Sequence, residues 1–269
     1  MKKKFSLFVL LPAIMLSSCG NGAEVTDSAQ LKELQQGISA KVKDIKAYEM
    51  TSKSTGATYD EAEKKNIAQT SEMIYRQNAK EEKYLKTSSQ VGEEKSETTI
   101  YLVKNEKYQQ VLYIDSYDAE AKKNEISVYG YEGNELTFSF ASLYFISPEI
   151  YTELFLDPAG LDVASAIEAA GDEEDDMNVS AKYYSKGAGN LTVEISGSVK
   201  SEVKAEEEET AVKETLSATY DNYCWKSAVI EFESNKGNKN KTDITFTVKD
   251  DIKIELPSGW ESLINKEAA

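Results

Sequence analysis

The sequence predicts an α+β protein built around one large, mostly antiparallel β-sheet, with an N-terminal helix and a helical insertion. Three observations predict this class. Residues 27–46 repeat apolar side chains at helical spacing, whereas residues 47–143 and 178–260 form alternating segments separated by polar turns. Between these two sets, residues 148–170 lose the alternation and contain two prolines, each opening a short helical pattern.

The first element is an amphipathic helix over residues 27–46. Thr26 or Asp27 is a suitable N-cap, and Gly37 is the one residue inside the pattern that weakens it. The apolar residues at three- and four-residue spacing are Leu31, Leu34, Ile38, Val42 and Ile45.

Two groups of strands follow. The most plausible hairpin joins residues 98–104 to residues 107–115 around Asn105 and Glu106, and residues 60–67 are expected to form a charged loop or one helical turn. The first group comprises residues 47–55, 69–77, 82–91, 97–104, 106–115, 125–133 and 135–143; the second comprises residues 179–185, 190–200, 214–221, 224–234, 242–249 and 250–260.

Alternation within these strands predicts which side chains face the core. One strand is expected to point Leu191, Val193, Ile195 and Val199 inward, and another to do the same with Ile244, Phe246 and Val248. Residues 100–103, 111–114 and 128–131 are apolar on both faces. A sheet with such strands is either covered on both sides or wraps around something.

The N-terminus has the pattern of an export signal. Three lysines at positions 2–4 precede an apolar run too short to span a bilayer, which predicts a signal peptide over residues 1–18. Leu16, Ser17, Ser18 and Cys19 resemble a bacterial lipobox. That resemblance implies cleavage before Cys19 and a diacylglyceryl group on its sulfur, with residues 19–26 as a lipidated tether and residues 27–269 as one β-rich domain.

Composition excludes several functions. Removal of residues 1–18 lowers the formal charge from −16 to −19, which argues against nucleic acid as a partner and favours a soluble monomer. The chain has no histidine, so triad hydrolases and common zinc sites are excluded. With Cys19 acylated, Cys224 has no partner in the chain, and its aromatic neighbours favour a buried thiol.

The chain has two acidic runs, at residues 173–176 and 206–209; the first does not match a calcium loop, because Met177 occupies the position that requires glycine. They are expected to be solvated. No phosphate-binding loop is present either, and no carboxylate pair stands out among the 47 acidic residues. We therefore expect no enzymatic activity, no cofactor and no metal.

A dense aromatic group lies around the insertion. Two interpretations are open: a helix that packs on the sheet, or the lining of a cavity for an apolar ligand. The candidate lining residues are Tyr144, Phe145, Tyr151 and Phe155.

This order of elements resembles the LolA–LppX group of bacterial envelope proteins, and residues 252–260 (IKIELPSGW) look like the final strand and close of such lipoproteins. The resemblance implies a curved sheet, or unclosed barrel, whose concave face carries acyl chains. We expect a non-catalytic, extracytoplasmic lipoprotein, anchored to the bacterial cell membrane through Cys19, that binds or carries a lipid. The alternative is a cell-surface module that binds protein or polysaccharide through an acidic, Tyr-rich exterior.

Overall fold

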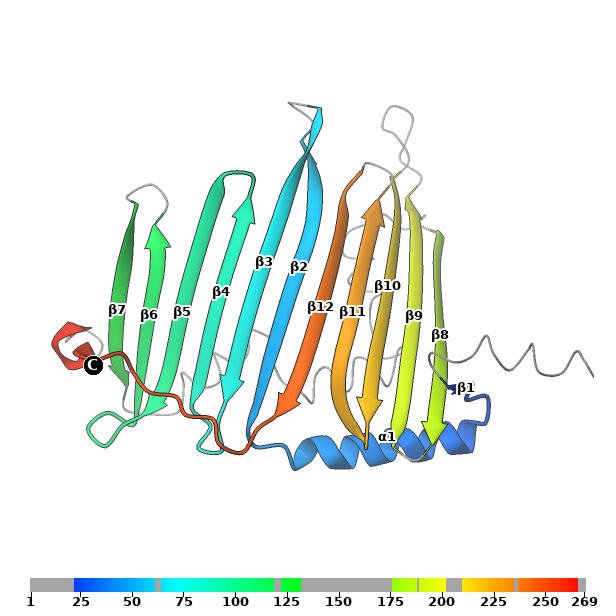
Figure 1. Ribbon diagram of the computed structural model, residues 1–269, viewed down its shortest axis with the longest axis horizontal. Helices are drawn as coiled ribbons and strands as arrows, with labels where there is room; N and C mark the ends of the chain where they lie inside the picture. The colour runs from blue at the N-terminus through cyan, green and yellow to red at the C-terminus, as the bar shows by residue number, and fades with distance from the viewer. Residues whose placement is uncertain are drawn as a thin grey trace, which may run out of the picture.

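The computed structural model describes residues 22–60, 64–118, 122–131, 176–187, 189–201, 210–234 and 237–265. These residues form one open, curved, mostly antiparallel sheet with a single α-helix, which confirms the predicted class (Figure 1). The insertion predicted at residues 148–170 lies outside them. The elements are β1 (Ala23–Glu24), α1 (Ser28–Lys43), β2 (Tyr48–Asp60), β3 (Lys65–Gln77), β4 (Lys83–Val91), β5 (Glu94–Lys104), β6 (Gln110–Asp118), β7 (Lys123–Tyr131), β8 (Asp176–Gly187), β9 (Asn190–Ser201), β10 (Thr210–Asp221), β11 (Cys224–Ser234), β12 (Lys239–Val248), the 3-10 helix η1 (Trp260–Leu263) and β13 (Ile264–Asn265).

The sheet consists of two meanders that meet in its middle. The strand order is β1-β8-β9-β10-β11-β12-β2-β3-β4-β5-β6-β7-β13, so β12 pairs with β2 although most of the chain separates them. All pairs are antiparallel except that between β13 and β7. The two-residue strands β1 and β13 therefore cap opposite edges of the sheet.

Helix α1 forms where the sequence predicts it. The Asp27 side chain accepts a hydrogen bond from the Ala29 amide at 2.8 Å, as an N-cap does. Leu34, Ile38 and Val42 are buried along one face and join the core. In Figure 1 the helix lies along the ends of the strands from β8 towards β2.

The larger core covers one face of the sheet, which we call the apolar face. Register places Met50 beside Tyr75, and the row continues through Leu85 and Ile100, each less than 5% exposed. In the other meander, Leu191, Val193 and Ile195 are buried as predicted. Because strand side chains alternate between faces, the intervening residues form a second face, which we call the polar face.

A smaller core lies on the polar face near β7. Val111, Tyr113 and Val128 are buried there, and the C-terminal strap (residues 249–265) packs on them through Trp260 and Ile264. The strands around β6 are thus covered on both faces, which is one of the two arrangements that their two-sided apolar pattern predicts.

Some predicted boundaries are wrong. Residues 252–257 of the strap are not a strand, although Ile254 is buried, because no neighbouring strand hydrogen-bonds to them in the described ladder. Val248 is 43% exposed rather than inward, since β12 ends there. Strands β2 and β3 reach Asp60 and Lys65, so the loop predicted over residues 60–67 is too long.

The β5–β6 hairpin is confirmed with a longer connection than predicted. Its last pair is Lys104 with Gln110, which leaves residues 105–109 as the loop. The Asn105 side chain accepts hydrogen bonds from the Lys107 and Tyr108 amides at 2.9 and 3.2 Å, which closes the turn locally.

Candidate functional site

The polar face carries rows of charged and hydroxyl side chains that cross the strands. One row runs from Lys53 on β2 to Glu72, Ser88 and Glu97 on β3, β4 and β5. These residues belong to strands whose other face is apolar, so alternation alone places them together on the outside.

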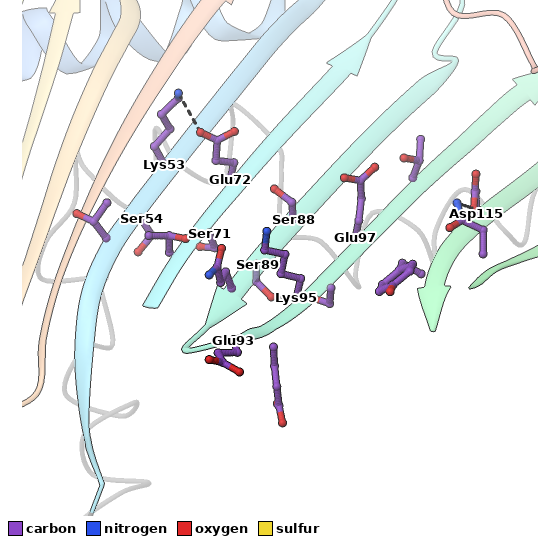
Figure 2. A pocket seen from close by; sticks show the side chains of 18 of the residues that line it. Lys53, Ser54, Ser71, Glu72, Ser88, Ser89, Glu93, Lys95, Glu97 and Asp115 are labelled. Atoms are coloured by element: carbon purple, nitrogen blue, oxygen red, sulfur yellow. Dashed lines mark hydrogen bonds and ion pairs between the residues drawn. The ribbon is translucent and has the colours of Figure 1, made fainter. Parts of the chain in front are cut away.

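A wide, open trough with a volume of about 920 Å³ lies over this row. It lies over β2 to β7 at the sheet end opposite α1, and Figure 2 shows its lining side chains. The residues that define this polar trough are Lys53, Ser54, Thr55, Thr70, Ser71, Glu72, Ser88, Ser89, Gln90, Glu93, Glu94, Lys95, Ser96, Glu97, Thr99, Asp115, Tyr117, Lys122 and Asn124.

Ion pairs and hydrogen bonds order parts of the trough. Lys53 Nζ lies 3.0 Å from Glu72 Oε1, and Asn124 Nδ2 donates to Asp115 Oδ1 at 2.9 Å. Glu97 Oε1 lies 2.9 Å from the Nζ of Lys86, just outside the lining. That hydrogen bond raises the pKa of Lys86 against a smaller opposing effect of burial. These pairs are more than a third exposed, so each contributes only about 0–1 kcal/mol to stability and remains open to a ligand.

The lining has more carboxylates than ammonium groups. Its acidic side chains come from Glu72, Glu93, Glu97 and Asp115, whereas its cations come from three lysines. Hydroxyl and amide groups fill the remaining positions. Such a surface offers many exchangeable hydrogen bonds and repels polyanions.

A ladder of tyrosines borders the trough on the α1 side. The ring centroids of Tyr84 and Tyr101 are 5.0 Å apart and those of Tyr101 and Tyr113 are 5.7 Å apart, both in edge-on geometry. Arg76 lies 5.3 Å above the Tyr84 ring. Burial and then neighbouring tyrosines and Asp115 raise the pKa of Tyr101, so its hydroxyl stays protonated at neutral pH.

Two smaller hollows continue along the same face. One of about 380 Å³ lies over β8 to β11 and includes Lys182, Glu194 and Ser217. The other, of about 290 Å³, lies over β10 to β12 and β2 and includes Lys213 and Lys241. The polar face is therefore grooved over both meanders.

The site residues predicted from the sequence are elsewhere in the chain. Tyr144, Phe145, Tyr151 and Phe155, and the lipidation residue Cys19, all lie outside the residues that the structure describes. The trough was missed because its residues are spread over six strands. The signal that could have found it is a strand segment that is polar throughout, such as residues 94–99, once its register with the neighbouring strands is known.

Metal ions need sets of ligand side chains that lie close together. Within the described ranges, no group of three or more His, Cys, Asp or Glu side chains could hold a metal ion. The acidic runs at residues 173–176 and 206–209 contribute no described side chain. None of the helices in the described part is both long and apolar enough to cross a membrane.

Cys224 is buried, as predicted, and makes no disulfide within the described residues. Burial raises the pKa of its thiol, an effect that the charges of Lys226 and Lys41 only partly oppose. A thiol of this kind is a poor nucleophile.

Comparison with known proteins adds no assignment to this geometry. Neither the protein-family models nor the curated proteins compared with the chain match it.

Proposed function

We propose that this protein is a non-catalytic, extracytoplasmic lipoprotein, anchored to the bacterial cell membrane through Cys19, that binds a polysaccharide in the polar trough. The observation that carries the proposal is the trough itself: a broad polar hollow of about 920 Å³ lined by hydroxyl, amide and carboxylate groups. The signal peptide and lipobox pattern support the location.

The shape of the trough favours a polymer over a small molecule. Six neighbouring strands at a spacing of about 4.8 Å give a length of roughly 24 Å across β2 to β7. Small-molecule sites are usually enclosed clefts or cavities, whereas this hollow is wide and open. An extended chain of hydroxyl-bearing units would meet hydrogen-bonding partners on each strand.

The charge of the trough narrows the ligand class. The carboxylates of Glu72, Glu93, Glu97 and Asp115 outnumber the three ammonium groups, so sulfated or phosphorylated polymers would be repelled. A neutral or amino-bearing polysaccharide fits this surface. Glu72 and Glu97, whose lysine partners are solvent-exposed, can exchange those partners for sugar hydroxyl or ammonium groups.

Affinity electrophoresis through gels that contain neutral, amino-bearing or sulfated polysaccharides tests this proposal. Glu97→Gln should weaken retardation in the best gel several-fold, because it removes a carboxylate acceptor from the trough. Glu81→Gln is the matched control: Glu81 also pairs with a lysine, Lys104 at 3.3 Å, but it lies at the opposite end of the strands. Absence of retardation by any polysaccharide, or equal effects of both variants, would contradict the proposal.

A second candidate function is the carriage of an apolar ligand such as a lipid. It is supported by the apolar face, whose core runs from β9 to β6 while α1 lies along one end of the sheet. The resemblance to the LolA–LppX group supports the same candidate. Organic extraction of natively purified protein followed by mass spectrometry distinguishes the two: co-purified lipid, together with uptake of a fluorescent fatty acid, would favour the carrier.

A further inference from the structure

Residues 22–25 are attached to the edge strand β8 of the sheet. Gly22 has a φ of +99°, and a Cβ there would lie 2.4 Å from the Ser185 carbonyl oxygen, so only glycine fits. Ala23 and Glu24 then pair with β8, and the Val25 amide donates to the Tyr183 carbonyl at 2.8 Å.

This attachment leaves a very short tether. Two residues, Gly20 and Asn21, lie between Cys19 and Gly22, and the three Cα–Cα steps of this segment span at most about 11 Å. If Cys19 is acylated, as the proposed function requires, the bilayer surface lies within that distance of the Gly22 end of β8. The tether is too short for the domain to tumble freely above the membrane.

Helix α1 lies at the same end of the sheet. It begins three residues after Val25 and runs along the strand ends (Figure 1). Its apolar face is used by the core through Leu34, Ile38 and Val42, which leaves a polar outer face that includes Lys32, Gln36 and Lys43. That face has no large apolar side chain to insert into lipid, so it suits contact with headgroups.

The charge distribution is compatible with this contact. Residues 24–46 contain four lysines and four acidic residues and are neutral overall, although the mature chain has a formal charge of −19. The last turn of α1 and the residues after it carry Lys41, Lys43 and Lys46 against Asp44 alone. The segment around α1 is thus spared the electrostatic repulsion that an anionic bilayer exerts on the rest of the protein.

We infer that the outer face of α1 rests on the headgroups of the bilayer and that the polar trough points away from it. The 13-residue strands β2 and β3 rise about 3.3 Å per residue, which places their far ends roughly 40 Å from the helix. The hairpin residue Glu93, at the far end of the trough, would therefore be directed to the cell exterior.

Headgroup quenching of a fluorescent label tests this orientation. The full-length protein, purified from membranes and reconstituted in phosphatidylcholine–phosphatidylglycerol vesicles, is labelled with bimane at Gln36→Cys or at Glu93→Cys. Lipid that carries a nitroxide on its headgroup should quench the label at position 36 several-fold more than the label at position 93. Insertion of about 20 Gly and Ser residues after Gly20, with a mean span of about 25 Å, should remove the difference.

The outcomes separate the orientation from the anchor. Equal quenching at both positions in membrane-bound protein would overturn the inferred orientation and leave the anchor intact. A difference in quenching that persists after the Gly and Ser insertion would show that the short tether does not cause the orientation. Protein without an introduced cysteine should not label, because Cys224 is buried and Cys19 is acylated. Labelling of that protein at Cys19, with failure to bind vesicles, would instead refute the proposed anchor.

Discussion

Substitution of Gly37 in α1 tests how closely the helix packs on the sheet. In an isolated helix, Gly→Ala stabilises by about 1 kcal/mol. Here a Cβ at position 37 would lie 2.5 Å from Cδ1 and Cε1 of Tyr223, in the turn between β10 and β11. Carbon atoms normally pack at about 3.5–4.0 Å, so the ring or the helix must move by about 1 Å.

The expected net effect is destabilisation. Insertion of a methyl group into a packed contact costs about 1–3 kcal/mol, and a rigid tyrosine ring in a tight turn places this site in the upper part of that range. After subtraction of the helix-propensity gain, Gly37→Ala should lower the free energy of unfolding by about 1–2 kcal/mol. Urea unfolding followed by circular dichroism measures this as a lower midpoint with an unchanged slope.

Two further variants make the test specific. Ser39→Ala, on the exposed side of α1, should be neutral or slightly stabilising, which controls for helix propensity. Tyr223→Gly removes the ring at a position whose φ is +61°, where glycine is unstrained, so Gly37→Ala should cost less in that background. Stabilisation of the otherwise unmodified protein by Gly37→Ala would refute the close packing.

The remaining predictions concern a charge cluster, the strap and the thiol. Glu49 accepts hydrogen bonds from Lys249 and, at 2.6 Å, from Arg76. Burial alone would raise the pKa of Glu49, but these hydrogen bonds and the two positive charges outweigh burial, so the pKa of Glu49 is lowered below 4.5. Glu49→Gln should therefore lower the free energy of unfolding by about 1–2 kcal/mol at neutral pH. The difference between the variant and the wild type should vanish as the pH falls through the lowered pKa of Glu49, and urea unfolding at a series of pH values would measure this. Trp260→Ala should cost about 2 kcal/mol by loss of packing on β6 and β7, and a neutral result in the same assay would show that the strap contributes nothing. Cys224 should react far more slowly with a thiol reagent in the native protein than in urea, and equal rates would contradict its burial.

Local pattern was enough to predict α1 and most strands. The four-residue spacing of Leu34, Ile38 and Val42 indicates one buried stripe of the helix, and alternation in β9 indicates one buried face of the strand. Both patterns arise because buried positions require apolar side chains, whichever part of the chain packs against them. The same reason explains why the pattern of residues 252–257 wrongly predicts a strand: Ile254 is buried, but the backbone of these six residues has no ladder partner in the described sheet.

The candidate site was beyond local pattern. Lys53 and Glu72 form a pair only because β2 and β3 meet in one particular register, and Lys86 pairs with Glu97 for the same reason. A shift of register by one residue would turn each of these side chains to the other face. The predicted cavity residues around Tyr144 lie outside the described chain and remain a prediction.

By itself, the sequence determined the class of fold, the N-terminal helix, most strand positions and the burial of Cys224, because apolar periodicity follows from burial alone. Only the tertiary structure decided that β12 pairs with β2, that the strap covers β6 and β7, and that the N-terminal segment is fastened to β8. Each of these depends on contacts between residues far apart in the chain. Such contacts arise from strand order and register, which leave no local mark on composition or spacing.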